Sequence, residues 1–348
     1  MNETSDEHTL PWPALPPWQR ETATQALARR ERWPHALLIT GRRGLGKRIL
    51  ALNFARALLC EAPLADGSAC GSCAGCSYVA HGAHPDLRLI EPYTYDDDGN
   101  ATRVDTIAVE RIRELIDFTH LSTHRRRAKV AVIVPAEAMN PAAANALLKT
   151  LEEPPAQTYL LLVSHQPERL PATIVSRCLR LSVPEPGREA GSEWLEEHGI
   201  ERPELLLAQA GGAPLLALDL ADAHVQRGRE MLLAELAQPE RLSPVAFGAR
   251  IDAVPKDERK GQLADALYWL LTWSADLASV AAGGAPRFHP DRADALARLA
   301  GRVARVPLFR YYRELLRQRS LLAHPLQPRL VAEALLFEYR NLFRGQGG

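Results

Sequence analysis

The segment GRRGLGKR, residues 41–48, has the residue types and the spacing of a phosphate-binding loop. It lies between a short apolar run and a run with helical periodicity, which is the context that such a loop requires. Gly41, Gly44 and Gly46 would let backbone N–H groups turn toward phosphates, and Lys47 would reach the β- and γ-phosphates. An ordinary turn between a strand and a helix is the alternative interpretation.

Three positions argue against a complete Mg²⁺ site at this loop. A phosphate-binding loop normally places Ser or Thr directly after its lysine, and Arg48 stands there instead. Val134 and Pro135 follow the apolar run 129–133, where an acidic pair would hold the metal and orient water. Glu137 comes two or three places late, and we expect it to begin or cap the following helix. The sequence therefore predicts weak or absent binding of ATP or ADP.

Four cysteines are clustered in the spacing CX9CX2CX2C, namely Cys60, Cys70, Cys73 and Cys76. An iron–sulfur run would place its fourth cysteine at residue 80, which is alanine. Four thiolates with no open position favour a structural, tetrahedral Zn²⁺ site. His81 and His84 are possible substitutes for one ligand, although a lone histidine is more often a surface or core residue.

Other segments carry chemistry only in some contexts. The run NALLKTLEEPP at residues 145–155 predicts a packing helix that its two prolines end. The basic run HRRRAK at 124–129 is more typical of a turn before a buried strand than of a DNA contact. Arg177, in SRC at 176–178, is either an ordinary surface arginine or a guanidinium that reaches the nucleotide of a neighbouring subunit.

Composition limits what these residues can do. The 348 residues carry 42 Lys and Arg against 42 Asp and Glu, so the whole chain has no electrostatic attraction to nucleic acid. The first ten residues lack the pattern of a secretory signal, and no apolar stretch is long enough to span a bilayer. We therefore expect a cytoplasmic protein with no membrane partner, whose clustered cysteines bind metal instead of forming disulfides.

The elements that must position these residues form two kinds of structure. Short apolar runs alternate with helical segments up to about residue 183, which predicts a parallel sheet covered by helices on both faces. The proline-rich residues 11–18 are expected to form an extended arm. After residue 183 the strand signals disappear, and we expect a small helical domain at 184–220 and a larger helical domain at 221–348.

The combination of these motifs resembles the bacterial clamp-loader subunits of the AAA+ class, which form part of the DNA polymerase III holoenzyme. The resemblance rests on the loop, the cysteine insert, and the segments HPDL at 84–87, NALLKTLEEPP, PERL at 167–170 and SRC. It is dense over about residues 12–182 and sparse afterwards. The motor subunits of that family, gamma or tau, keep a complete loop and an acidic pair. With Arg48, Val134 and Pro135, this chain resembles the delta-prime type.

The resemblance implies an α/β RecA-like (AAA+) P-loop domain at 1–183 with a zinc module at 60–76. It implies a helical lid domain at 184–220 and an all-α collar domain at 221–348. The implied role is a ring member that does not hydrolyse ATP and supplies Arg177 in trans to a neighbour. The implied partners are gamma or tau and delta in a five-subunit ring, with the sliding clamp and primed DNA reached through the complex.

Two rival functions remain at this point. An ATP-hydrolysing motor subunit is disfavoured by the missing metal ligands. A stand-alone zinc-dependent DNA-binding protein is disfavoured by the balanced charge and by the lack of a basic recognition helix beside the cysteines.

Overall fold

The computed structural model describes residues 13–95, 101–125, 127–321 and 327–344. The chain divides into two compact units, Met1–Pro186 and Gly187–Gly348, called here the N-terminal and the C-terminal unit. None of the helices in the described part of the chain combines the length and the apolar character that crossing a lipid bilayer requires.

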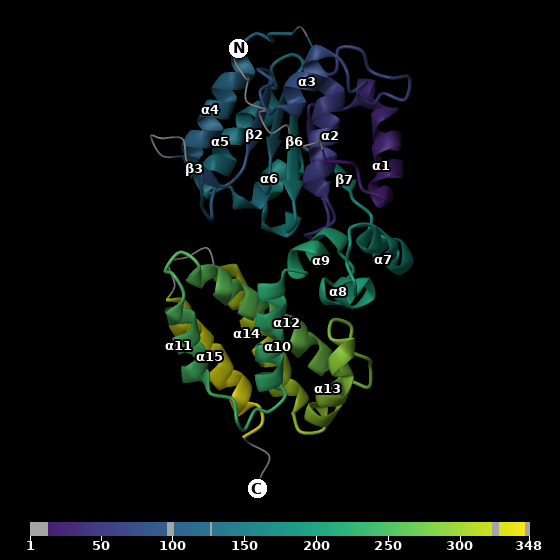
Figure 1. Ribbon diagram of the computed structural model, residues 1–348. Helices are drawn as coiled ribbons and strands as arrows, with labels where there is room; N and C mark the ends of the chain where they lie inside the picture. Colours follow the sequence, from purple (N-terminus) through teal and green to yellow (C-terminus); the bar gives the residue numbers. More distant parts are fainter. Residues whose placement is uncertain (1–12, 96–100, 126, 322–326, 345–348) are drawn as a thin grey trace, which may run out of the picture. The chain divides into compact units, whose positions relative to one another are not determined.

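A five-stranded parallel sheet is the centre of the N-terminal unit (Figure 1). Its order is β2 (Leu87–Ile90), β5 (Lys129–Ile133), β6 (Thr158–Ser164), β1 (Ala36–Thr40) and β7 (Leu179–Ser182). The three central strands are almost continuous runs of buried Val, Ile, Leu and Ala, as expected for strands with both faces covered. The strand that precedes the loop therefore lies inside the sheet, between β6 and β7.

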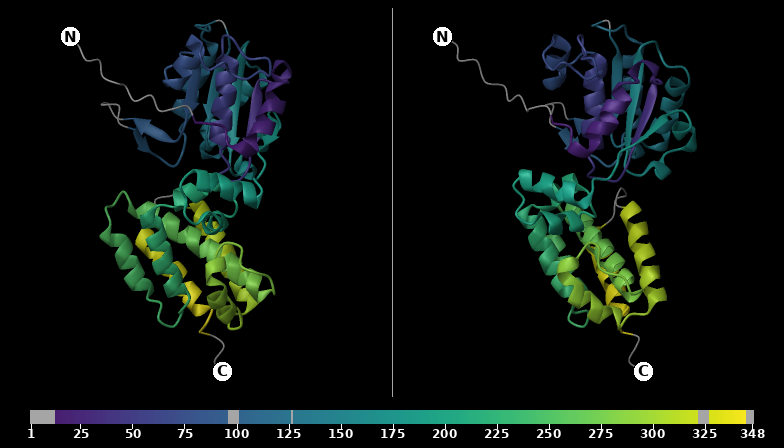
Figure 2. Two further views of the ribbon diagram at one scale, coloured as in Figure 1. Left: turned by 45° about the vertical axis from the view of Figure 1, so that its right-hand side comes forward. Right: turned by 90° about the vertical axis from the view of Figure 1, so that its right-hand side faces the viewer.

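Helices cover both faces of this sheet (Figure 2). On one face α4 (Val109–His120) and α5 (Pro141–Glu152) pack against alternate residues of the central strands. The other face carries α2 (Lys47–Leu59), which α1 (Pro17–Leu27) and α3 (Ala74–Ala80) contact in turn. Shorter elements complete the unit: η1 (Arg30–Arg32), η2 (Ala136–Ala138), η3 (Pro167–Arg169), α6 (Ala172–Val175), and the antiparallel pair β3 (Tyr93–Tyr95) and β4 (Ala101–Arg103).

The parallel sheet and its helical layers were predicted, and residues 145–155 form the packing helix α5 as expected. The expectation of an extended arm over residues 11–18 is wrong at its end, because α1 begins at Pro17. Proline is tolerated in the first turn of a helix, where its missing N–H has no intrahelical partner to lose. Residues 11 and 12 lie outside the described residues.

The C-terminal unit is helical throughout its described residues. It contains α7 (Arg188–Glu197), α8 (Pro203–Gln209), α9 (Pro214–Leu220), α10 (Ala223–Leu236), α11 (Pro244–Ala253), α12 (Arg259–Ala281), η4 (Pro290–Arg292), α13 (Ala293–Ala300), α14 (Arg305–Leu321) and α15 (Pro328–Asn341). The long helix α12 contacts α10, α11, α13, α14 and α15. Its Trp273 Nε1 donates to the hydroxyl of Tyr339 at 2.9 Å, and that hydroxyl donates to the carbonyl of Leu236 at 2.9 Å.

Candidate functional site

The loop at residues 41–48 has the backbone that its glycines predict. Gly41, Gly44 and Gly46 have φ angles of 148°, 82° and 84°. Residues that have a side chain rarely adopt positive φ angles of this size, so glycine is favoured at each of these three positions. Gly46 is the N-cap of α2, which begins at Lys47. The loop therefore follows β1 and leads directly into a thirteen-residue helix.

Lys47 lies within this turn and not on the surface. Its side chain is almost fully buried, and its Nζ donates to the carbonyl of Arg42 at 2.5 Å. Burial lowers the pKa of Lys47 to about 8, while the Glu137 carboxylate acts in the opposite direction. The lysine is thus held at the centre of the loop by the loop's own backbone.

Arg48 occupies the position where the hydroxyl is missing, and it has a partner that the sequence did not reveal. Its Nε donates to Glu91 Oε1 at 2.9 Å and its Nη2 to Glu91 Oε2 at 3.2 Å. Glu91 directly follows β2, and two strands, β5 and β6, lie between β2 and the strand β1 that precedes the loop. A paired guanidinium therefore stands where a complete loop would help to hold Mg²⁺.

The end of β5 carries no acidic pair, because the buried Val134 and then Pro135 follow the strand. Glu137 lies in the first turn of the short helix η2, as expected of a residue near a helix start, but it caps neither η2 nor α5. Asn140 is the N-cap of α5 and accepts from the N–H of Ala143, whereas Glu137 Oε1 accepts the backbone N–H of His165 at 2.9 Å. The carboxylate is therefore turned toward the end of β6.

His165, which directly follows β6, is a site residue that sequence reasoning missed. Burial lowers its pKa to about 3, and the nearby charges of Lys47 and Arg43 act in the same direction. No pattern around this lone histidine marks it, because its neighbours in the site, Lys47, Arg43 and Glu137, come from distant parts of the chain.

The residues at the positions that hold Mg²⁺ in a complete phosphate-binding loop thus do not fit that ion. Mg²⁺ requires near-octahedral oxygen coordination. The loop offers a guanidinium in place of a hydroxyl, and β5 offers Val134 and Pro135 in place of carboxylates. Glycines, lysine and helix N-terminus remain, so the arrangement keeps the parts that face phosphate and lacks those that face the metal.

The four cysteines come together as predicted. The Sγ atoms of Cys60, Cys70, Cys73 and Cys76 all lie within 4.8 Å of one another. Backbone N–H groups point at these sulfurs: that of Cys70 reaches Cys60 Sγ at 3.3 Å, and that of Cys76 reaches Cys73 Sγ at 3.4 Å. Such amide donors stabilise thiolates, so the donor set can hold a metal ion.

Neither His81 nor His84 belongs to this group. His81 Nδ1 lies 2.7 Å from the carbonyl of Ser77, and His84 Nδ1 accepts the backbone N–H of Asp86 at 3.0 Å. The Nδ1 atoms of both histidines thus contact nearby backbone groups.

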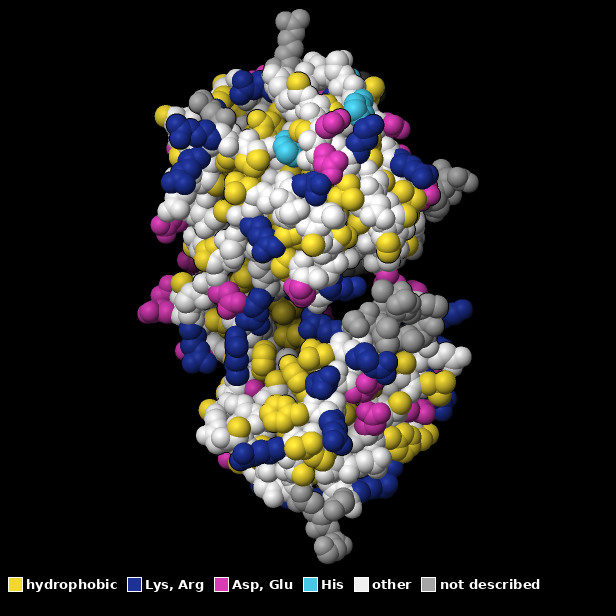
Figure 3. All heavy atoms as spheres, turned by 180° about the vertical axis from the view of Figure 1, so that it is seen from behind, with side chains coloured by type: hydrophobic (Ala, Val, Ile, Leu, Met, Phe, Trp, Pro, Cys, Tyr) yellow, Lys and Arg dark blue, Asp and Glu magenta, His cyan; other side chains and the backbone are white. Residues whose placement is uncertain are grey.

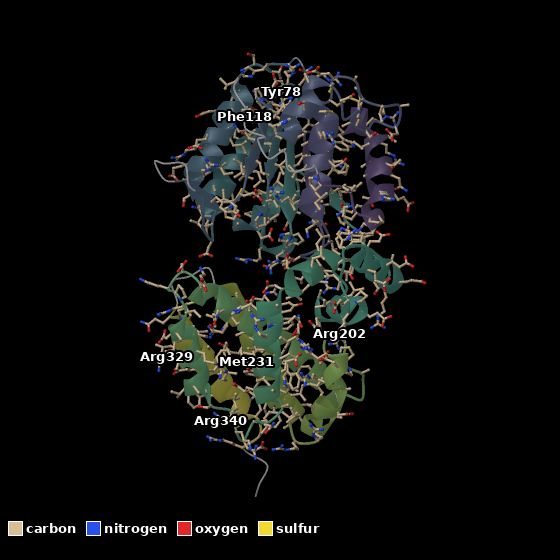
Figure 4. All side chains as sticks on the ribbon, viewed as in Figure 1. Tyr78, Phe118, Arg202, Met231, Arg329 and Arg340 are labelled. Atoms are coloured by element: carbon tan, nitrogen blue, oxygen red, sulfur yellow. The ribbon has the colours of Figure 1, made fainter. Side chains whose placement is uncertain are left out.

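Asp86, from the HPDL segment, is fully buried and fixes the basic turn. Its carboxylate accepts the N–H groups of His124 and Arg125 at 3.0–3.1 Å and lies 3.6 Å from Lys129 Nζ. Lys129 Nζ also lies 4.1 Å from the ring centre of Phe118, which Figure 4 labels on α4. This segment therefore has a structural role in the N-terminal unit.

The basic turn also contacts the cysteine module. Arg125 pairs with Glu61, the residue after Cys60, and stacks over Tyr78 at 5.2 Å.

On the face of the N-terminal unit drawn in Figure 3, basic and acidic side chains alternate without a broad area of one sign. This face offers no extended basic surface to a nucleic acid.

Arg177 lies between α6 and β7 and is about one-third exposed. Its Nη2 donates to Glu152 Oε1 at 2.5 Å, and its Nη1 donates to the carbonyl of Thr173 at 2.9 Å. Glu152 is the last residue of α5, within the LEEPP segment. The guanidinium is thus held by two neighbouring elements while part of it faces solvent.

The parallel sheet, the glycine-rich loop after β1 and the helix that starts at Lys47 define a P-loop protein of the AAA+ class. The sequence model of the family described as DNA polymerase III, delta subunit, matches residues 19–186. The delta' subunit of Haemophilus influenzae is 32% identical over 246 residues, which cover 70% of each chain. The chain belongs to the family of DNA polymerase III delta' subunits.

Further relatives match over shorter segments. The delta' subunit of Pseudomonas aeruginosa is 42% identical over 221 residues, 62% of this chain and 64% of the relative. That of Escherichia coli is 35% identical over 226 residues, 64% and 65% of the two chains. The chain therefore spans slightly less than two thirds of the length of these two relatives. Among solved structures, a DNA polymerase III gamma subunit-related protein of Thermotoga maritima matches with a TM-score of 0.40 at 19% identity, over 94% of this chain and 100% of that one.

Proposed function

We propose that this chain is the delta'-type member of a clamp-loader ring and acts without hydrolysing ATP itself. Its partners are gamma or tau and delta subunits in a heteropentamer, and it reaches the sliding clamp and primed DNA through that complex. Membership of the delta' family supports this role. The observation that carries the non-hydrolysing part is the bidentate pair of Arg48 with Glu91, at the place where Mg²⁺ would be held.

Arg177 is the residue by which the chain acts on a neighbour. A planar, permanently charged guanidinium can pair with a γ-phosphate presented across a subunit interface and stabilise the charge that develops in hydrolysis. Its partial exposure and its two anchors, Glu152 and the carbonyl of Thr173, support this role. The anchors restrict the side chain before a partner arrives, which reduces the entropy lost on binding.

The cysteine cluster has a structural role in this proposal. Cys60, Cys70, Cys73 and Cys76 would hold one Zn²⁺ with no position left for water or substrate. The ion would fix the module at 60–76 against the basic turn through the Arg125–Glu61 pair.

The C-terminal unit would carry two functional parts of the subunit. We assign residues 184–220, which begin three residues before this unit, to a lid domain, and residues 221–348 to a collar domain that joins the subunits. The two parts share one hydrophobic cluster, and Tyr268 of α12 donates to the carbonyl of Gln209 in α8 at 2.7 Å. The lid and the collar would therefore move as one body within this subunit.

Gel filtration of the purified chain with the tau and delta subunits of its own organism tests the assembly. We expect one stoichiometric complex that contains all three proteins and requires this chain. Separate elution of this chain at all mixing ratios would contradict the assignment to the ring.

A further inference from the structure

Glu91 and Arg48 close the metal side of the loop. The two guanidinium nitrogens of Arg48 reach one carboxylate oxygen each, at 2.9 and 3.2 Å. This geometry is the fork that arginine also offers to a phosphate group. The carboxylate of Glu91 therefore occupies the edge of Arg48 that a phosphate would use.

The loop also keeps a buried cation, Lys47, whose charged form the Glu137 carboxylate favours without forming an ion pair with it. Lys47 is only 2% exposed, and among the described residues its Nζ has one hydrogen-bond partner, the backbone carbonyl of Arg42. No carboxylate of the described residues forms an ion pair with it. Burial of this cation costs stability, and an ammonium group has three donors to place, of which the carbonyl of Arg42 accepts one. This second observation, independent of the loop backbone, indicates an anionic ligand.

We propose that the loop binds the di- or triphosphate group of a ligand free of divalent metal, and that Arg48 takes the place of Mg²⁺. Lys47 and the loop N–H groups hold the phosphates, and Arg48 leaves Glu91 to pair with them. The inference rests on the proposed non-hydrolysing role of this loop, but it does not depend on assembly of the ring. Glu91 competes with the ligand for Arg48 and so lowers the affinity of the loop for that ligand.

Metal should oppose binding at such a site. A phosphate chain that carries Mg²⁺ would bring a second cation against the guanidinium, where no hydroxyl and no acidic pair can coordinate it. Mg²⁺ in solution also withdraws the ligand by binding its phosphates. This is the opposite of a complete phosphate-binding loop, in which metal and ligand bind together.

Isothermal titration calorimetry of the full chain tests this directly. ADP, ATP and pyrophosphate are each titrated once with EDTA and once with excess Mg²⁺. We expect binding in EDTA that weakens at least several-fold with Mg²⁺. If pyrophosphate binds as well as ADP, the ligand is a polyphosphate in general, and if only the nucleotides bind, the base contributes.

Two variants isolate Arg48 and Glu91. Arg48→Thr removes charged hydrogen bonds to phosphate, so affinity in EDTA should fall by roughly tenfold or more. Glu91→Gln releases Arg48, and affinity should rise several-fold. Arg111→Thr is the matched control, because Arg111 pairs with Glu114 on α4, away from the loop, and should leave affinity unchanged.

The outcomes separate clearly. Binding that requires Mg²⁺, or equal affinity of wild type and Arg48→Thr in EDTA, contradicts the proposal. So does the absence of binding by both wild type and Glu91→Gln. If Arg48→Thr fails to fold, the comparison of wild-type affinity in EDTA and in Mg²⁺, together with the affinity of Glu91→Gln, still tests the proposal. Gel filtration with tau and delta measures assembly independently of calorimetry. A result against the ring proposal can therefore be told apart from a result against metal-free binding at the loop.

Discussion

Arg48 determines what this chain can do with a nucleotide. Any phosphates bound at the loop would contact Lys47 and the N-terminus of α2, but the position of Mg²⁺ is taken by the Arg48 guanidinium, which pairs with Glu91. Proteins that hydrolyse ATP at such a loop need metal and water in defined positions, and here Arg48, Val134 and Pro135 stand where the metal ligands would be. At the scale of single residues, we therefore expect a site that can contact phosphates but does not catalyse their transfer.

The isolated chain is therefore expected to show no ATP hydrolysis above background. Arg48→Thr alone should not create activity, because Val134 and Pro135 still follow β5 where the carboxylates are needed. Steady-state phosphate release measures this, with Lys47→Ala as the control for a contaminating ATPase. Turnover of about 1 per second that disappears in Lys47→Ala would overturn the expectation.

Arg177→Ala should leave the chain folded and the complex assembled, but lower the ATPase of that complex when clamp and DNA stimulate it. A single arginine finger contributes roughly 10³ to 10⁵ in rate, and other sites in a ring continue, so the total should fall by less. Arg177→Lys should restore little, because lysine supplies charge without the fork. Arg180→Ala, an exposed arginine on β7, is the control, and an equal effect of both variants would leave Arg177 an ordinary surface residue.

The cysteine module is an element whose structure depends on its ligands. Its cysteines extend from the C-cap of α2 into the first turn of α3, and a Cβ on Gly75 of α3 would meet the carbonyl of Leu59 at 2.7 Å. This close approach leaves the module little room to rearrange.

Metal analysis of the purified chain should find one zinc per chain. Chelation should raise hydrogen exchange in residues 60–80, while β1, β5 and β6 keep their protection, because thiolate ligation stabilises only this insert. Cys178→Ser should retain the metal, since Cys178 lies outside the cluster, whereas Cys73→Ser should lose it. A chain without zinc, or one with iron and visible absorbance, would refute the assignment.

The loop after α12 is held by a buried polar centre. Asp276 accepts the backbone N–H groups of Phe288 and His289 at 2.9 and 2.7 Å. Arg229 Nη2 donates to His289 Nδ1 at 3.1 Å, and since a guanidinium only donates, His289 must carry its proton on Nε2, which faces Thr272 Oγ1 at 3.0 Å. A second proton would break the bond to Arg229 and place two cations together.

Acid should therefore destabilise this unit. Burial, with the charge of Arg229 acting in the same direction, lowers the pKa of His289 from 6.5 to about 3. Between these values the unfolded chain binds a proton that the folded chain does not, so stability falls as pH drops from 6.5 toward 3, by up to ~1.4 kcal/mol per pH unit.

Urea unfolding followed by tryptophan fluorescence measures this dependence. His289→Gln keeps a donor and an acceptor but cannot titrate, so the stability of this variant should vary less with pH than that of the wild type. His224→Gln, an exposed histidine on α10, should keep the wild-type slope. Parallel pH profiles for wild type and His289→Gln would show that His289 does not titrate as described.

Across the whole molecule, the sequence predicted what local patterns encode. Continuous apolar runs gave the central strands, and the glycines of residues 41–48 gave the loop conformation. The short, exposed strand β7 has no such run, and it was not predicted. Tertiary pairs were also missed: nothing near Arg48 in sequence indicates Glu91, and nothing near Glu137 indicates His165, because these partners meet only when the strands align.

The account makes the chain a necessary but non-hydrolysing ring member, and loading of a labelled sliding clamp onto primed circular DNA tests that claim most directly. The assay compares three mixtures at the same ATP concentration: tau and delta alone, tau and delta with this chain, and tau and delta with the Arg177→Ala variant of this chain. We predict loading only when this chain is present, and slower loading with the variant. Equal loading by tau and delta with and without the chain would contradict the account.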